Sequence, residues 1–211
     1  SLITPVSNRP APVSAAPFPL PTFSMSAPSF PAASAAVRPV IAIHGGAGTL
    51  SRGQISPEQA EAYHAALHGI LEAGQQILAA GGTALDAVCL AVKLLEDCPL
   101  FNAGHGAVFT SRETHELDAA VMDGATLAAG AVAGVCRVRN PVEAARAVMV
   151  RGQHVLMAGE GAEAVAREAG LAAVSPDYFS TEARRQQLHA ARARHAGACL
   201  LYTSDAADDS L

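Results

Sequence analysis

The chain has 211 residues, 50% of them hydrophobic and 16% charged, with a formal net charge of -5 at pH 7. This length is sufficient for one domain with a sizeable core. The acidic balance, without a basic run interleaved with aromatic residues, argues against nucleic-acid binding. No apolar stretch approaches the roughly 18 residues that a membrane-spanning helix requires. We therefore expect no nucleic acid and no membrane among the partners of this protein.

The cysteines indicate a reducing compartment. Cys89, Cys98, Cys136 and Cys199 form no C-x-x-C pair and no zinc-ligand spacing. A free cysteine behaves as a small, commonly buried apolar residue, so we predict reduced, packed thiols. Such thiols are typical of a cytoplasmic protein.

The first 37 residues differ from the rest of the chain. They contain most of its prolines, many Ser and Ala residues, and no acidic residue. A segment of this composition cannot bury enough apolar surface to offset the entropy lost on ordering. We predict a disordered leader over residues 1–37, with the folded part beginning at Arg38.

The folded part begins with a short apolar run. Residues 39–43 predict a buried strand, which the glycine loop HGGAG at 44–48 ends. This loop has neither the Lys-Ser/Thr ending of a P-loop nor the glycine spacing of a dinucleotide fold, so nucleotide binding is not predicted. Ser56, with Pro57 and Gln59, then predicts a capping box at the start of a helix. A Gly-Gly pair ends that helix.

A second helix and a glycine-containing turn follow. Thr83 is placed as the N-cap of this helix, with Asp86 three residues on, and Pro99 marks its end. The turn Asn-Ala-Gly-His-Gly comes next, where glycines let the backbone approach a ligand or another backbone closely. The apolar runs 107–110 and 117–122 then predict two strands joined by a polar turn.

The remaining elements indicate an α+β fold. Strands do not alternate strictly with helices, which favours a layered fold with a mixed or antiparallel sheet over a doubly wound one. A capping pattern at Asn140 opens one of the later helices, and the last helix is polar, with Leu188 and alanines facing inward. The predicted elements are strands at 127–138 and 154–157 and helices at 141–150, 161–169 and 181–195.

Two groups of polar residues are candidate sites. His44, His105 and His115 are scattered between elements without H-x-x-x-H spacing, so loop histidines with local hydrogen bonds are favoured over a metal site. Asp118 and Asp123 lie five residues apart and would point to opposite faces of a strand. Capping or ion-pair roles are favoured for them over acid–base catalysis.

Several long motifs carry a family resemblance. The chain resembles the plant-type L-asparaginase/isoaspartyl peptidase family of N-terminal nucleophile hydrolases, with the strongest likeness to bacterial isoaspartyl peptidases, over residues 38–197. The matching segments are VIAIHGGAG, GGTALDAVCLAVKLLEDCPLFNAGHGAVFT, HELDAAVMDG, AGAVAGVCRVRNPVEAAR, HVLMAGEGAE and VSPDYFSTEARRQQL.

The resemblance implies a precursor that cleaves itself into an α and a β chain. The β chain then begins with a threonine whose hydroxyl attacks asparagine or a β-aspartyl dipeptide. The implied fold is a four-layer αββα sandwich, assembled as a homodimer of αβ units. This sequence matches the α-chain half, so we expect no nucleophile in it and no activity from it alone. Residues 198–211 have no counterpart in the family and are interpreted as an artefactual tail.

The resemblance also implies supporting site residues. Asn102, Gly45 and Gly46 match positions in the wall of the active site. No cofactor is implied for the chemistry, but a structural sodium ion is implied in the loop after the second helix. Backbone carbonyls suit such a hard cation, and those implied belong to Leu95, Glu96, Cys98, Phe101, Ala103 and His105.

Two other functions remain open at this point. A glycosylasparaginase-type amidase shares the superfamily, although the HGGAG and Asn-Ala-Gly motifs argue against it. A non-catalytic binding module made of a stand-alone α half would require this part of the chain to fold cooperatively by itself.

Overall fold

The computed structural model describes residues 38–46 and 55–194. By its internal contacts the chain divides into two units, Ser1–Val37 and Arg38–Leu211, and every described residue belongs to the second. The predicted leader at 1–37 and the predicted tail at 198–211 therefore lie outside the described residues.

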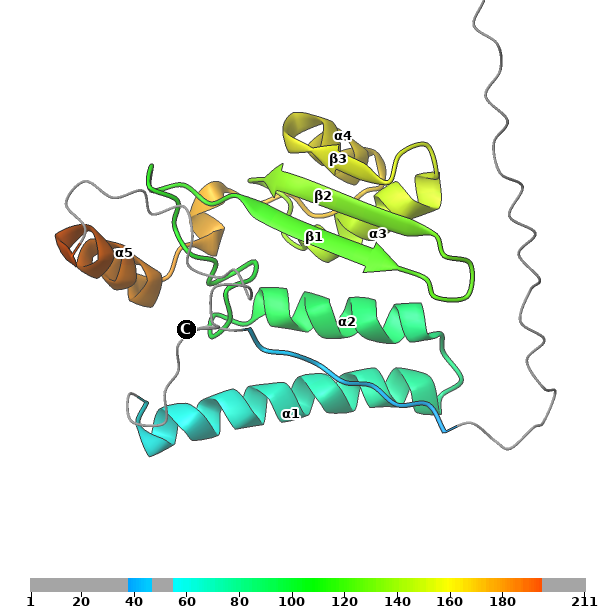
Figure 1. Ribbon diagram of the computed structural model, residues 1–211, viewed down its shortest axis with the longest axis horizontal. Helices are drawn as coiled ribbons and strands as arrows, with labels where there is room; N and C mark the ends of the chain where they lie inside the picture. Colours follow the sequence, from blue (N-terminus) through cyan, green and yellow to red (C-terminus); the bar gives the residue numbers. More distant parts are fainter. Residues whose placement is uncertain (1–37, 47–54, 195–211) are drawn as a thin grey trace, which may run out of the picture. The chain divides into compact units, whose positions relative to one another are not determined.

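Helices and strands are mixed along the described chain (Figure 1). Among the described helices, none is both long enough and apolar enough to cross a membrane. In chain order the elements are α1 (Pro57–Ala79), α2 (Ala84–Asp97), β1 (Leu117–Met122), β2 (Ala129–Val135), α3 (Pro141–Arg151), β3 (Leu156–Ala158), α4 (Gly159–Glu168), the 3-10 helix η1 (Pro176–Phe179) and α5 (Glu182–Arg194).

The first two helices begin where local sequence places them. Ser56 Oγ accepts a hydrogen bond from the Gln59 amide at 3.2 Å, and Gln59 Oε1 accepts one from the Ser56 amide at 3.0 Å. Thr83 Oγ1 accepts from the Asp86 amide at 3.0 Å. Each cap satisfies an amide that the helix itself leaves unpaired, an effect of about 1 kcal/mol. The predicted capping box and the predicted Thr83 cap are confirmed.

The cap of α3 is different from the predicted one. Asn140 makes no side-chain cap, and its Nδ2 donates to Asp97 Oδ1 at 3.2 Å. Glu96, at the end of α2, supplies the acceptor: its Oε1 receives a hydrogen bond from the Val142 amide at 2.9 Å. The acceptor that caps the first turn of α3 thus comes from a residue 46 positions away in the sequence.

Within the described residues the sheet has three strands, with β2 in the middle. β1 pairs with β2 in antiparallel register, with Ala120 opposite Ala131. β3 pairs with β2 in parallel register, with Leu156 opposite Ala131. The sheet is therefore mixed, as expected, and the α+β class is confirmed.

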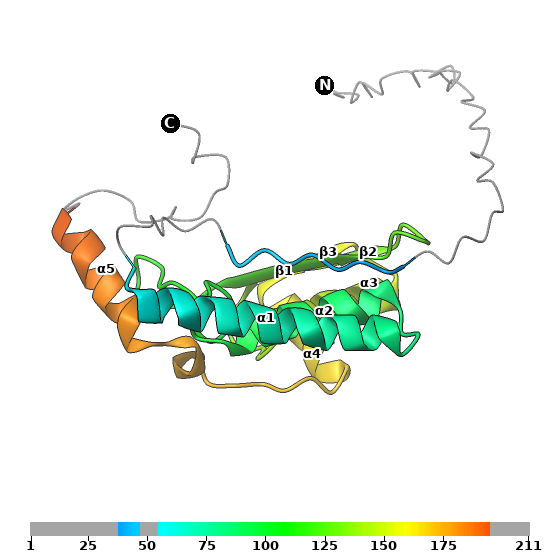
Figure 2. The same cartoon turned by 90° about the horizontal axis from the view of Figure 1, so that it is seen from below.

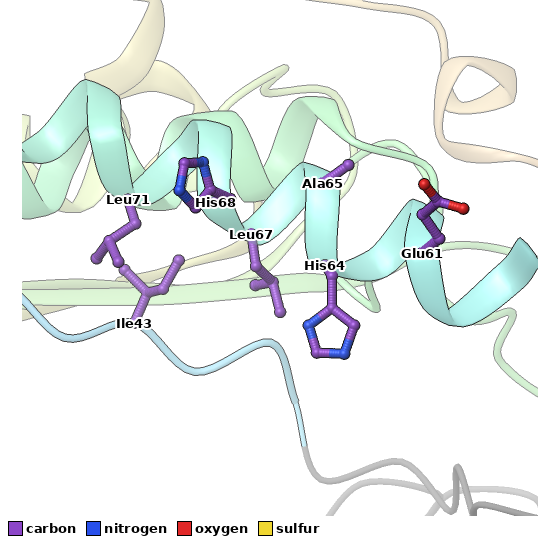
Figure 3. Close-up of a pocket in the computed structure, with 7 residues that line it drawn as sticks. All are labelled: Ile43, Glu61, His64, Ala65, Leu67, His68 and Leu71. Atoms are coloured by element: carbon purple, nitrogen blue, oxygen red, sulfur yellow. The ribbon is translucent and has the colours of Figure 1, made fainter. Parts of the chain in front are cut away.

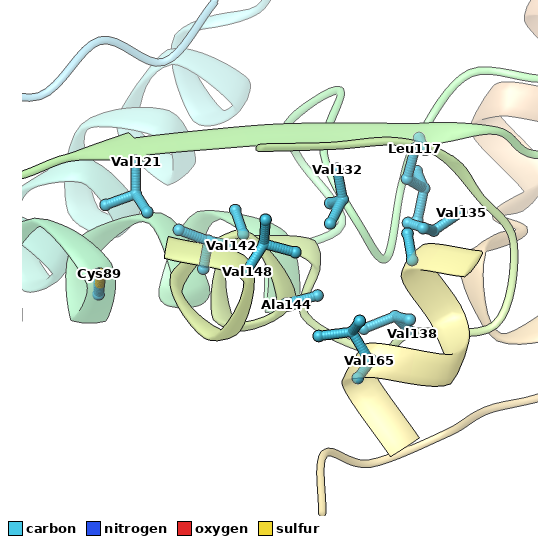
Figure 4. Close-up of a cluster of buried hydrophobic side chains, with 14 of the residues drawn as sticks. Cys89, Leu117, Val121, Val132, Val135, Val138, Val142, Ala144, Val148 and Val165 are labelled. Atoms are coloured by element: carbon cyan, nitrogen blue, oxygen red, sulfur yellow. The ribbon is translucent and has the colours of Figure 1, made fainter. Parts of the chain in front are cut away.

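One face of the sheet carries the main core (Figure 4). Val132 and Val135 of β2 are 1% and 0% exposed and pack with residues of α3 and α4. A Cβ at Gly130 would collide with backbone atoms of Ala145 and Met149. Glycine is therefore required at this position, because α3 approaches β2 too closely for any side chain.

The other face of the sheet is bare. Figure 2 shows α1 to α4 on one side of the strands. On the opposite side the strands present Ala120, Met122, Ala131 and Leu156, and Met122 and Leu156 are 56% and 60% exposed. Apolar side chains that alternate with buried ones on a strand predict a covered face, and within the described residues this face has no cover.

Residues 39–43 do not form the predicted buried strand. Val40 is 88% exposed, and the segment belongs to no ladder among the described residues. Ile41 and Ile43 pack against α1 in a second core cluster that includes Ile70. The apolar run thus reflects packing on one side, whereas a strand also needs a hydrogen-bonded neighbour.

Residues 107–110 also lack a strand. Ala107 and Phe109 are buried, which explains the strand-like alternation. The backbone bonds in this run are turn and side-chain bonds instead: the Val108 amide donates to Asn102 Oδ1, and the Thr110 amide donates to the Thr114 carbonyl at 2.8 Å. The predicted strand at 117–122 is confirmed as β1.

The remaining predicted elements are present with shifted ends. β2 ends at Val135 rather than at residue 138, because the chain bends there and Val138 forms an isolated bridge with Ala173. β3 and α4 each lie one to two residues away from the predicted bounds. In α5, Leu188 is 6% exposed, which confirms the predicted inward-facing position.

Candidate active-site wall

The loop after α2 is folded tightly against the end of that helix. Gly104 and Gly106 have φ values of +47° and +114°, in the left-handed region. A Cβ on Gly104 would collide with the Glu96 carbonyl, and one on Gly106 would lie 2.6 Å from the Pro99 carbonyl. Both glycines are therefore required by the geometry, which explains the turn recognised in the sequence.

Asn102 closes this loop. Its Oδ1 accepts a hydrogen bond from the Val108 amide at 2.9 Å, so the side chain spans the base of the turn. The residue is exposed. Its amide group can therefore reach a molecule on the surface while the backbone around it is held.

The structure brings the two predicted glycine loops together. A Cβ on Gly45 would lie 3.0 Å from Cε1 of Phe101 and 3.3 Å from Cδ2 of Leu67. Gly46 follows with a φ of +110°, which favours glycine. Gly45 of the HGGAG motif thus packs on the ring of Phe101, the residue next to Asn102. The role of Asn102, Gly45 and Gly46 in an active-site wall stays a prediction.

The six predicted cation-binding carbonyls all lie in one short segment. Within it the Leu95 carbonyl accepts from the Cys98 amide at 3.2 Å, and the Glu96 carbonyl accepts from the His105 amide at 2.6 Å. The turn therefore folds back onto the end of α2, where these two carbonyls accept backbone hydrogen bonds. In the part of the chain that the structure describes, no three His, Cys, Asp or Glu side chains cluster as metal ligands. Carbonyl ligation of a hard cation fits this donor set.

Glu96 is the most unusual group beside the loop. Its side chain is 3% exposed, and Oε2 has no hydrogen-bond partner among the described residues. Burial raises the pKa of this carboxyl to about 8, with a smaller contribution from the nearby Asp97. At neutral pH the group is therefore mostly protonated. Sequence reasoning assigned only the backbone of this residue.

Two histidines make local hydrogen bonds, as favoured. His115 is buried; its Nδ1 donates to the Val108 carbonyl at 3.1 Å, so its Nε2 accepts from Ser180 Oγ at 3.0 Å. Burial lowers the pKa of His115. His105 Nδ1 donates to the Tyr178 carbonyl at 2.6 Å. These bonds join the loop after α2 and the segment before β1 to η1 and to Ser180, which directly follows it.

The two aspartates of the β1 region accept hydrogen bonds from nearby groups. Asp118 Oδ1 accepts from the Gly134 amide at 2.8 Å. Asp123 accepts from the Ala125 amide at 2.9 Å and from the Thr126 hydroxyl at 2.8 Å, and these bonds lower its pKa. The capping role is confirmed for Asp123, whereas Asp118 bonds across the sheet to β2.

Sequence reasoning missed an H-x-x-x-H pair on α1. His64 and His68 line an open groove of about 580 Å³ together with Ile43 and other residues of α1 (Figure 3). Figure 3 shows the two rings pointing in different directions from the helix. The spacing could have been found in the sequence, but the rings do not converge on one point.

Sequence reasoning also missed Arg184. From the first turn of α5, its Nε donates to the Gly106 carbonyl at 2.6 Å, across 78 residues of sequence. Burial lowers the pKa of Arg184. No local pattern could have indicated this contact, because the partner is a backbone atom of a distant glycine.

Comparisons with known proteins cover the same region. The chain is 65% identical over 154 residues to an isoaspartyl peptidase of Salmonella typhimurium and 63% identical over 153 residues to one of Escherichia coli. These matches cover 73% and 72% of this chain, and 49% and 48% of those proteins. It is 47% identical to a plant-type L-asparaginase of Pyrococcus abyssi, over 70% of this chain and 46% of that protein.

The chain thus spans about half the length of the curated relatives that it matches. The match to a family model is equally broad: the model described as "Asparaginase" covers residues 37–208. Both glycine loops, the whole sheet and α5 lie inside this range. The chain belongs to the asparaginase family that this model defines.

Proposed function

We propose that this chain forms part of an isoaspartyl peptidase/L-asparaginase, which hydrolyses β-aspartyl dipeptides and asparagine. The observation that carries the proposal is the joining of the Gly45–Gly46 loop to the Asn102 loop through Phe101. This arrangement gives an exposed amide beside glycine backbone that a small polar substrate can approach closely. Relatives at 65% and 63% identity bear the name isoaspartyl peptidase, which supports the same activity.

In this proposal the chain supplies the wall of the site and a second polypeptide supplies the nucleophile. That nucleophile is an N-terminal threonine freed by autocleavage, with its own amine as the base. Its place is in the half of the relatives' length that this chain does not match. Asn102 then lies beside the nucleophile, where its amide orients the reacting groups and does not itself take part in bond formation.

The bare face of the sheet supports a β-chain partner. Met122 and Leu156 are exposed apolar side chains on a surface that is otherwise mostly alanine. A second sheet packed on this face would complete the αββα sandwich, with this chain as its α half. A pair of such αβ units forms the proposed homodimer.

We assign the loop after α2 as a structural sodium site. The carbonyls of Leu95, Glu96, Cys98, Phe101, Ala103 and His105 would hold the ion. The ion would brace the turn that carries Asn102 and would have no part in the chemistry. The free thiols of Cys89, Cys98 and Cys136 support a cytoplasmic location.

A split-protein assay tests the proposal. The 211-residue chain is purified alone and is also mixed with the second half of the Salmonella relative, released from a tag so that it begins with threonine. We expect no hydrolysis of a β-aspartyl dipeptide by either half and clear hydrolysis by the mixture. Asn102→Ala in the mixture should reduce kcat at least about tenfold.

Two results would contradict the proposal. Turnover by the chain alone that disappears in Asn102→Ala would show that the nucleophile lies within these 211 residues. A mixture that forms a stable complex but hydrolyses neither asparagine nor a β-aspartyl dipeptide would refute the proposed activity.

A further inference from the structure

The Asn102 loop is held from two sides. On the α2 side, the His105 amide donates to the Glu96 carbonyl at 2.6 Å. On the opposite side, η1 supplies the acceptors: the Gly106 amide donates to the Phe179 carbonyl at 3.0 Å, and His105 Nδ1 donates to the Tyr178 carbonyl at 2.6 Å. The α2 side comes from the adjacent sequence, whereas the η1 side is more than 70 residues away.

Arg184 completes the second side. Its side chain is partly buried, with Nε donating to the Gly106 carbonyl at 2.6 Å and a terminal nitrogen donating to Gln187 Oε1 at 2.9 Å. Within the residues described, it forms no ion pair with a carboxylate. The carbonyl of Gly106 is therefore a main partner of a partly desolvated guanidinium, and such charge-assisted bonds are among the stronger ones.

Gly106 is consequently fixed at both its backbone groups by one segment, residues 179–184. Its left-handed φ of +114° allows the chain several alternatives if either bond is lost. Two residues further on, the Val108 amide makes the hydrogen bond to Asn102 Oδ1. The orientation of Asn102 thus depends on where Gly106 is held.

We propose that Arg184 is a positioning residue for Asn102, acting through the Gly106 carbonyl and the Asn102–Val108 hydrogen bond. The proposal rests on the proposed function for the role of Asn102, but the contact it describes is independent of activity. The first turn of α5 then acts as a clamp on the active-site wall. Docking of this helix, and not only the sequence of the loop, sets the geometry of the wall.

Hydrogen exchange on the ¹⁵N-labelled 211-residue chain tests this without any substrate. In Arg184→Ala we expect the Val108 amide to exchange about tenfold faster or more, because a charge-assisted bond that restrains the loop is lost. The Asn102 side-chain amide resonances should shift as well. The core amides of β2 should keep their wild-type rates, because they lie in the separate cluster packed on α3.

Two further variants make the test specific. Arg184→Lys keeps a donor of similar reach and should restore most of the protection at Val108. Arg192→Ala is the matched control, because it removes an arginine of the same helix that pairs with Glu113 and donates to the Ser111 carbonyl at 2.7 Å. It should leave the Asn102 resonances and the Val108 rate unchanged.

The outcomes separate this proposal from the proposed function. Unchanged Val108 exchange in Arg184→Ala, or an equal rise at Val108 and in β2, would overturn the positioning role. In the split-protein mixture, Arg184→Ala should lower kcat about tenfold with KM within about twofold of wild type. A mixture without any activity would refute the proposed function, while the exchange result would still stand or fall by itself.

Discussion

The two faces of the small sheet both carry apolar side chains, but one face is buried and the other is exposed. On the inner face Val132 and Val135 are completely covered by α3 and α4. On the outer face lie Ala131, which directly precedes Val132, and its neighbour Leu156 on β3. Neither has a covering layer among the described residues. The pattern of a strand therefore predicts that a side chain will be covered, but not by which polypeptide.

A charge placed on each face should give the largest difference in unfolding free energy between the two faces. Val132→Asp buries an unpaired carboxylate and should reduce the free energy of unfolding by about 4 kcal/mol or more. Ala131→Asp, its neighbour on the outer face, should change that free energy by less than about 1 kcal/mol. Urea unfolding followed by circular dichroism measures both. Equal losses would show that the outer face is covered within this chain.

The inner side also contains the buried Glu96, which caps α3. Glu96→Ala leaves the Val142 amide without its acceptor and should cost about 1–3 kcal/mol in unfolding free energy. Glu96→Gln keeps the acceptor and resembles the protonated acid, so its stability at pH 7 should lie within about 1 kcal/mol of wild type. Urea midpoints compare the two. A larger loss in the glutamine variant would mean that the carboxylate is charged when folded.

His115 gives a smaller effect that depends on pH. Burial lowers its pKa below 6.5, so the folded state favours the neutral ring. The stability contributed by the neutral ring is present above the unfolded value of 6.5 and is lost as the pH falls through the lowered folded value. The slope should not exceed about 1.4 kcal/mol per pH unit for one proton. In His115→Gln the free energy of unfolding, measured by urea titration from pH 7.5 to 5, should depend less on pH than in wild type. An unchanged slope would assign the pH dependence of stability to other groups.

The smallest effect on unfolding is expected for Leu156→Ser on the outer face. Because this side chain is 60% exposed, the free energy of unfolding should change by less than about 0.5 kcal/mol. The affinity of the Leu156→Ser chain for the second half of the Salmonella relative, measured by titration calorimetry, should be clearly lower than that of the wild-type chain. A stability loss as large as that of a core variant would remove the distinction between the two faces.

Local patterns predicted the elements whose causes are local. Ser56 and Thr83 cap their helices because the acceptor and the amide lie within three residues of each other. The predicted Asn140 cap was wrong because Glu96, which is 46 residues away, accepts from the Val142 amide that such a cap would satisfy. Residues 39–43 and 107–110 alternate like strands, but alternation reports burial and cannot report a missing ladder neighbour.

The same distinction applies to the candidate site. The glycines of the loop after α2 are visible in sequence because their conformations exclude other residues. The resemblance to a family named Asn102, Gly45 and Gly46, and the structure brings these two loops together. Arg184 remained hidden, because an arginine in a polar helix resembles any solvated one until its carbonyl partner is known.

The capping of α3 by Glu96 has a consequence for how the chain folds. A helix that is capped by a neighbouring residue can form early in folding. In α3 the capping acceptor is Glu96, so the cap forms only when the end of α2 has docked. The two helices should therefore gain their stability together as one cooperative unit. A peptide covering α3 alone should be nearly unstructured in water, since its 11 residues are also too few for an isolated helix.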